Sequence, residues 1–270
     1  MPRNVSGHFV RSKSGWRHAA AAGIWKAPSD PSIYGVIEAD VTQALGYLER
    51  LEAATGERVT ITHLVAKAVA HGLAENPQCN GYIRFGRVYL RDEVDVFVLV
   101  AITPENAPVE GGQKADLSGV VVRGADRVSL PELAKVVRQS ARGARHEGKE
   151  AFDRLRRALG FTTPFVTRLG LKVATFLQYD LNVNLSALGV PQDSFGGAMV
   201  SSMGMFGVRL GFPAIVPIMR HSLSMGVCRV EQRPWVVDGQ ICVRSILPLS
   251  VTLDHRVVDG YQAGRVGQAI

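Results

Sequence analysis

The sequence contains little cysteine and no long apolar run. Its three cysteines, Cys79, Cys228 and Cys242, are odd in number and form no C-x-x-C pair, so we expect neither a disulfide framework nor a metal site. No apolar run approaches the roughly 18 residues that a spanning helix needs, which excludes a polytopic membrane protein. The basic N-terminal stretch lacks the apolar core of a secretory signal, so a cytoplasmic location is predicted.

The chain has fewer acidic than basic residues. It contains 24 Asp and Glu against 31 Lys and Arg, so its net charge is +7. The excess lies in residues 1–30, with five basic residues and one acidic, and in residues 123–157, with ten and five. No RNP, zinc-finger or helix-turn-helix signature accompanies these segments, so nucleic acid is not expected as a partner. We interpret them as solvated basic surface on a globular chain that is 46% apolar.

Start and stop signals predict three helices in the first half of the chain. Each combines a capping residue or a terminating Gly or Pro with apolar residues at helical spacing. They are expected after Asp40, with Gln43 completing a capping box and Gly56 ending the helix; from Thr60 to just before Pro77; and from Ser129, with Glu132 completing a second box.

Alternating, β-branched segments predict strands between these helices and throughout the last third. They are expected at residues 33–39, on both sides of Gly86, at 94–102, in AMVSS and SLSMGVCRV, in PWVV and QICVR joined by a hairpin at Asp238–Gly239, and in ILPLSVTLD. Early helices and late strands favour an α+β fold, a mixed sheet flanked by helices in one domain.

Residues 150–190 fit this plan poorly and are interpreted as an inserted helical region. Residues 161–179 mix apolar side chains with Arg168 and Lys172, a pattern typical of a basic amphipathic helix on a membrane surface. The same periodicity arises when a helix packs against protein, which we consider the more common origin.

The segment LDHRVVDG at 253–260 carries the clearest chemical signal. It follows a predicted strand, and neutral imidazole at His255 can accept a proton near physiological pH. Asp259 lies four residues further on, beside Gly260. A carboxylate there can hold the backbone of the site by pairing with an arginine, without touching the imidazole.

With this motif, the sequence resembles the catalytic domain of the dihydrolipoamide acyltransferases of 2-oxoacid dehydrogenase complexes, in the chloramphenicol acetyltransferase superfamily. The resemblance rests on stretches in the same order along the chain: DPSIYGVIEADVT, VTITHLVAKAVAHGLAENPQCN, GADRVSLPELA, DSFGGAMVSSMGMFG and RPWVVDGQICVRSILPLSVTLDHRVVDG. It implies a trimer-forming chloramphenicol acetyltransferase-like fold at residues 31–270, preceded by a basic segment at 1–30.

The resemblance also implies the chemistry. His255 matches the general base that activates a thiol, hydroxyl or amine acceptor, which attacks the thioester of acyl-coenzyme A directly. Ser201 matches the hydroxyl that donates to the oxyanion, and Arg17 is the predicted partner of Asp259. His255 and Ser201 are expected to meet across the subunit interface of a homotrimer.

Two departures separate this chain from that family. Only about 30 residues precede the shared core, so no covalently attached lipoyl group is expected, and a separate lipoyl protein or dehydrogenase subunits become possible partners. The apolar channel segment is replaced by NAPVEGGQKADLSGVVV at 106–122. Three hypotheses follow: an acyl-coenzyme A-dependent acyltransferase, a trimeric scaffold that has lost turnover, and a membrane-associated variant. The short C-terminal helix predicts no assembly into a cage.

Overall fold

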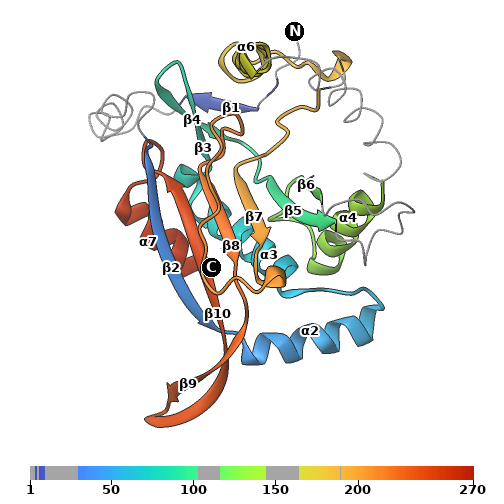
Figure 1. Cartoon of the computed structure of the whole chain (residues 1–270), viewed down its shortest axis with the longest axis vertical. Helices are drawn as coiled ribbons and strands as arrows, with labels where there is room; N and C mark the ends of the chain where they lie inside the picture. The colour runs from blue at the N-terminus through green and yellow to red at the C-terminus, as the bar shows by residue number, and fades with distance from the viewer. Residues whose placement is uncertain (1–3, 5, 10–29, 103–115, 144–163, 189) are drawn as a thin grey trace.

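The computed structural model describes residues 4, 6–9, 30–102, 116–143, 164–188 and 190–270, and Figure 1 shows their arrangement. The strands are β1 (Gly7–Phe9), β2 (Ser32–Asp40), β3 (Gly81–Arg84), β4 (Arg87–Arg91), β5 (Val96–Ile102), β6 (Asp116–Val122), β7 (Ala198–Ser202), β8 (Leu223–Val227), β9 (Glu231–Val237) and β10 (Gln240–Asp254). A mixed sheet has the order β2-β10-β8-β7-β5-β6, with β9 paired to β10. A smaller sheet has the order β1-β4-β3.

Helices cover one face of the large sheet. They are α2 (Thr42–Thr55), α3 (Ile61–Glu75), α4 (Leu130–Gly143) and α7 (Gly260–Ala269). A further helix, α6 (Pro164–Thr175), lies beyond the small sheet and is followed by a π-helical turn, η2 (Phe176–Asp180) (Figure 1). Helix α3 contacts β7, α4 and α7, and its Ala66, Val69, Ala70 and Leu73 are fully buried. Each large apolar side chain buried in this way contributes about 1.5–3 kcal/mol to stability.

Small residues let α3 and α7 approach closely. A Cβ atom at Gly72 would lie 3.0 Å from the side chain of Ile270 and 3.5 Å from that of Val266. Contacts of 3.0–3.4 Å are tighter than most Cβ contacts in proteins, so a larger residue at position 72 would require Ile270 to shift. Helix α7 follows directly from the 253–260 motif, so this packing also fixes the motif's position.

The helix predictions are confirmed except for one cap. Ser129 and Glu132 form their capping box, α3 begins after Thr60, and Gly56 ends α2 with φ +70°. The predicted Asp40–Gln43 box is wrong. Asp40 is still the last residue of β2, and its carboxylate accepts hydrogen bonds from the backbone N (2.9 Å) and Oγ1 (2.6 Å) of Thr42.

The strand predictions need three corrections. QICVR and ILPLSVTLD are one continuous strand, β10, because the outer part pairs with β9 while the inner part pairs with β2 and β8. Strands β1 and β6 were not predicted, although β-branched residues at 120–122 are a signal for β6. The hairpin is confirmed, with φ +51° at Asp238 and +78° at Gly239.

The predicted helix within the 150–190 region is present as α6 and η2. These elements lie beside the turn between β3 and β4, where the rings of Phe85 and Phe176 meet edge to face with centroids 6.2 Å apart. None of the helices in the described ranges combines the length and apolar character that crossing a bilayer requires. The division at residue 30 stays a prediction.

Candidate active site

His255 directly follows the last residue of strand β10, on the turn that leads into α7. Its backbone N–H donates to the carbonyl of Pro31 (2.9 Å), and its ring Nδ1 lies 2.9 Å from the carbonyl oxygen of Val258. A carbonyl oxygen only accepts, so Nδ1 carries the proton in this contact. The lone pair of the neutral ring is therefore on Nε2, which is the state that a base requires.

The turn around His255 is held by core packing and an ion pair. Val257 and Val258 are 2% and 0% exposed, so the second and third residues after His255 are anchored in the core. Arg256 donates to the carboxylate of Asp254 from Nε (2.9 Å) and Nη2 (2.7 Å). The hydrogen bond with Asp254 raises the pKa of Arg256, and the guanidinium fixes the strand end against the turn.

Asp259 begins helix α7 as its N-cap. Its carboxylate accepts the backbone N–H of Gln262 (2.9 Å), and the Gln262 side chain accepts the backbone N–H of Asp259 (2.8 Å). This reciprocal pair satisfies two backbone donors of the first helical turn. Arg17, the predicted partner of Asp259, lies outside the described residues, so that ion pair stays a prediction.

Ser201 lies in the middle of the large sheet and is 9% exposed. Its strand β7 runs parallel to both neighbours, and Ser201 pairs in register with Leu99 and Gly226. Ala198 and Val200 belong to the core beneath the helices, so strand alternation points Ser201 to the opposite face. At Gly226 a Cβ atom would lie 2.3 Å from Met203, so that face is closely packed there.

The structure does not bring Ser201 and His255 together within one chain. Ser201 is in register with Gly226, which is in register with Ser250 of β10. His255 is five residues beyond Ser250 and two strands from β7. At about 3.3 Å per residue and 4.8 Å per strand, the two backbone positions are roughly 19 Å apart. One reacting carbonyl cannot contact both, so a shared site needs these residues from different chains.

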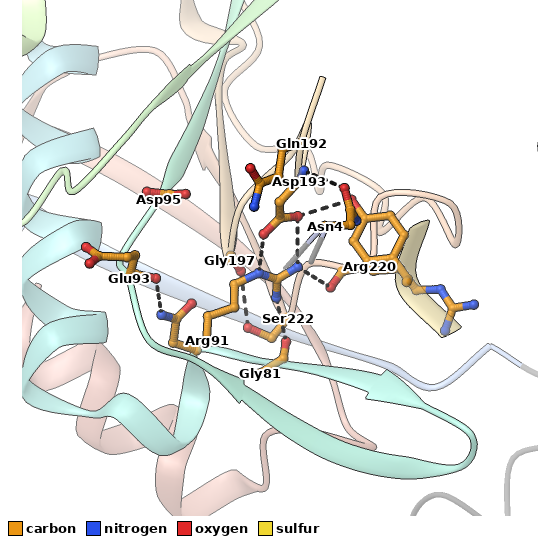
Figure 2. A network of polar contacts seen from close by, with 12 residues as sticks. Asn4, Gly81, Arg91, Glu93, Asp95, Gln192, Asp193, Gly197, Arg220 and Ser222 are labelled. Carbon is orange, nitrogen blue, oxygen red and sulfur yellow. Dashed lines mark hydrogen bonds and ion pairs between the residues drawn. The ribbon is translucent and has the colours of Figure 1, made fainter. Parts of the chain in front are cut away.

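A buried polar network, which the sequence did not reveal, lies near the start of β7 (Figure 2). Arg91 is almost fully buried and donates to the carboxylate of Asp193 from Nε (2.8 Å), and its Nη1 donates to the carbonyl of Gly81 (3.2 Å). Tyr179 of η2 donates to the same carboxylate (3.1 Å). Burial and the Asp193 charge raise the pKa of Tyr179, so the phenol stays a donor.

A cleft of about 570 Å³ borders this network, and none of His255, Ser201 and Asp259 lines it. Six of its seven charged residues form ion pairs: Arg91 with Asp193, Arg123 with Asp95, and Arg127 with Glu93. Across the described ranges, no group of three or more His, Cys, Asp or Glu side chains is placed to hold a metal ion. The cysteines are free, and burial raises the pKa of the Cys79 thiol to about 12.

The chain matches one family model and several known proteins. The family model for 2-oxoacid dehydrogenases acyltransferase (catalytic domain) matches residues 10–155 and 189–270. A dihydrolipoyllysine-residue acetyltransferase component of the pyruvate dehydrogenase complex from Mycoplasma capricolum is 25% identical over 256 residues, covering 93% of this chain and 47% of that protein. The chain thus spans about half the length of this curated relative.

Solved structures confirm the predicted fold. A dihydrolipoamide acetyltransferase from Azotobacter vinelandii aligns with a TM-score of 0.57 at 21% identity, covering 94% of this chain and 84% of that one. A serine, a histidine and an asparagine four residues after the histidine have been investigated in the catalytic mechanism of that enzyme. Chloramphenicol acetyltransferase aligns with a TM-score of 0.50 at 14% identity, covering 98% and 97%. The fold is chloramphenicol acetyltransferase-like.

Proposed function

Because the chain belongs to the family of 2-oxoacid dehydrogenase acyltransferase catalytic domains, we propose that it transfers an acyl group between coenzyme A and a thiol, hydroxyl or amine acceptor. The observation that carries the proposal is the bond from His255 Nδ1 to the carbonyl of Val258, which leaves the lone pair on Nε2. An acyltransferase without an acyl-enzyme intermediate needs a base of this kind on a rigid turn.

The proposed reaction is a direct transfer. The acceptor gives its proton to Nε2 of His255 as its sulfur, oxygen or nitrogen bonds to the thioester carbonyl carbon. The resulting tetrahedral intermediate collapses when the carbon–sulfur bond to coenzyme A breaks. The departing sulfur then takes the proton from the imidazolium, so His255 ends neutral and the transfer needs no other reagent.

Ser201 is the proposed donor to the oxyanion of that intermediate. It is distant from His255 in its own chain, so we propose that a site forms between two subunits of a homotrimer. A hydroxyl that donates to an oxyanion typically accounts for about 10²- to 10³-fold in rate. The relative named above acts on a dihydrolipoyllysine residue. A lipoyl group on a separate protein is therefore our preferred acceptor, and dehydrogenase subunits and a cytoplasmic location stay predictions.

The test compares His255→Ala with the parent chain. Acetyl transfer from acetyl-coenzyme A to free dihydrolipoamide should fall about 10²- to 10⁴-fold, while the coenzyme A affinity from calorimetry stays within a few-fold. His71→Ala, which removes an exposed histidine from α3, should keep full activity. Equal rates for His255→Ala and the parent would overturn the proposal and favour the scaffold hypothesis, as would a parent that binds no coenzyme A.

A further inference from the structure

Helix α6 and the turn η2 lie outside the part of the chain that matches the family model. The matched residues end at 155 and resume at 189, so residues 156–188 are an addition to the shared domain. Figure 1 places α6 at one end of the molecule, beyond the small sheet and away from the helices that cover the large sheet. No residue of this segment takes part in the proposed acyl transfer.

The segment and the β3–β4 turn together expose large apolar side chains that form one surface, here called the α6 patch: Phe85 from the turn, and Leu169, Val173 and Phe176 from the segment. Each is 45–59% exposed. Leu169, Val173 and Phe176 are spaced i, i+4, i+7, so they follow one side of the helix. Phe176 then contacts Phe85 of the β3–β4 turn, which extends the patch from the helix onto the small sheet.

The patch is rigidly attached to the domain. Asp180, at the end of η2, forms an ion pair with Arg220 (2.9 Å), and its carbonyl accepts a hydrogen bond from Nε of Arg84 (2.7 Å). Arg220 also donates to the carbonyl of Ile83 (2.7 Å). These contacts hold the β3–β4 turn against η2, so Phe85 and Phe176 keep a fixed position relative to each other and to the domain.

The charge around the patch has one sign. The described part of the segment, residues 164–188, contains two basic residues, Arg168 and Lys172, and one acidic residue, Asp180, which is buried and paired with Arg220. The strand ends beside the β3–β4 turn add two arginines, Arg84 and Arg87, and residues 81–90 contain no acid. Lys172 and Arg87 are exposed. Two copies of the patch facing each other about a twofold axis would oppose these cations, which disfavours a twofold dimer through this patch and favours an anionic occupant.

We propose that the α6 patch docks on an anionic lipid surface with α6 parallel to the membrane plane. The 12 residues of α6 span about 18 Å, well short of the roughly 30 Å of a bilayer core, so the helix lies along the surface. Apolar side chains enter the boundary between headgroups and acyl chains, and the neighbouring cations contact the anionic headgroups.

Co-sedimentation of the full chain with lipid vesicles tests this proposal. Binding is expected to vesicles of phosphatidylcholine with phosphatidylglycerol, not to phosphatidylcholine alone, and it should weaken at high salt. Val173→Glu should lower the partition coefficient about tenfold or more. Leu171→Glu is the matched control, because it adds the same charge about 200° around the helix from Leu169 and should change binding less than threefold.

The control also separates the patch from the basic stretches elsewhere in the chain, since both variants retain them. Equal binding by Val173→Glu and Leu171→Glu would overturn the proposal, because the attraction would then be unspecific. Failure of the full chain to sediment with either vesicle would overturn it as well. A change in oligomer mass on Val173→Glu, measured by native mass spectrometry, would instead assign the patch to a second copy. None of these outcomes depends on acyl transfer.

Discussion

The carboxylate of Asp259 accepts the backbone N–H of Gln262 in the first turn of α7, and the family resemblance predicts that it also pairs with Arg17. Two substitutions separate these roles. Asp259→Ala removes the cap and should lower the free energy of unfolding by about 0.5–2 kcal/mol. Asparagine caps about as well as aspartate, so Asp259→Asn keeps the α7 cap, and any remaining loss measures the predicted ion pair. Urea unfolding of both variants, alongside turnover, provides the comparison.

If Asp259→Asn is as stable as the parent and fully active, the prediction of an ion pair between Asp259 and Arg17 is wrong. If it is as stable but inactive, the carboxylate acts in the chemistry itself.

Arg91 and Asp193 form the most buried ion pair of the described residues, with side chains 2% and 7% exposed. Arg91→Leu should lower the free energy of unfolding by about 3–5 kcal/mol, because it leaves the Asp193 charge buried and unpaired. Tyr179→Phe should cost only about 1 kcal/mol, because Arg91 still neutralises the carboxylate. Thermal unfolding of the two variants tests the ranking, and a larger loss for Tyr179→Phe would contradict it.

The sequence predicts His255 and Asp259 as candidate site residues because both belong to a short motif. It did not reveal the Arg91 network, because Arg91, Tyr179 and Asp193 are 14 to 102 residues apart and share no local spacing. Only the tertiary fold places them together. The Asp40 cap was mispredicted for a related reason, since the pairing of β2 with β10 carries the strand through Asp40 and moves the helix start.

At the scale of secondary-structure elements, the N-terminal cap of α3 depends on pH, because it includes the titratable side chain of His63. The backbone N–H of Thr60 donates to Nδ1 of His63 (3.1 Å), so this cap requires a neutral ring. Burial and the charge of Arg138 lower the pKa of His63 to about 4. The unfolded chain, with a histidine pKa near 6.5, binds more protons between pH 6.5 and 4, so stability falls as the pH falls through this window.

His63→Gln keeps an acceptor at the same position of the capping box but does not titrate. The variant should therefore lose less stability than the parent between pH 7 and pH 5, by at most about 1.4 kcal/mol per pH unit. Urea unfolding at both pH values measures the difference. His221, whose pKa burial lowers to about 3, contributes equally to both chains. Parallel pH profiles would exclude His63 as the titrating group.

At the scale of the whole molecule, the β9–β10 hairpin extends beyond the body of the domain (Figure 1). Val236, Ile241 and Val243 lie on one face of it and are 66–79% exposed. If the homotrimer forms with this face in an interface, Ile241→Glu should convert a species of about 88 kDa, three times 29.2 kDa, towards the monomer. Gln240→Glu adds the same charge on the opposite face and should leave the mass unchanged.

Sedimentation velocity distinguishes the two variants. A parent chain that sediments at 29 kDa would contradict the homotrimer and, with it, a site shared between Ser201 and His255.

Strand β10 pairs with β2 from Ile246 to Asp254 and with β8 from Leu249 to Leu253. The pair Asp40 and Ile246 joins residues 206 positions apart. At a synthesis rate of about 5–20 residues per second, β2 emerges roughly 10–40 s before its partner exists. During that interval β2 is an unpaired edge on a nascent chain, and Glu38 and Asp40 are the charges that oppose its premature pairing with other chains.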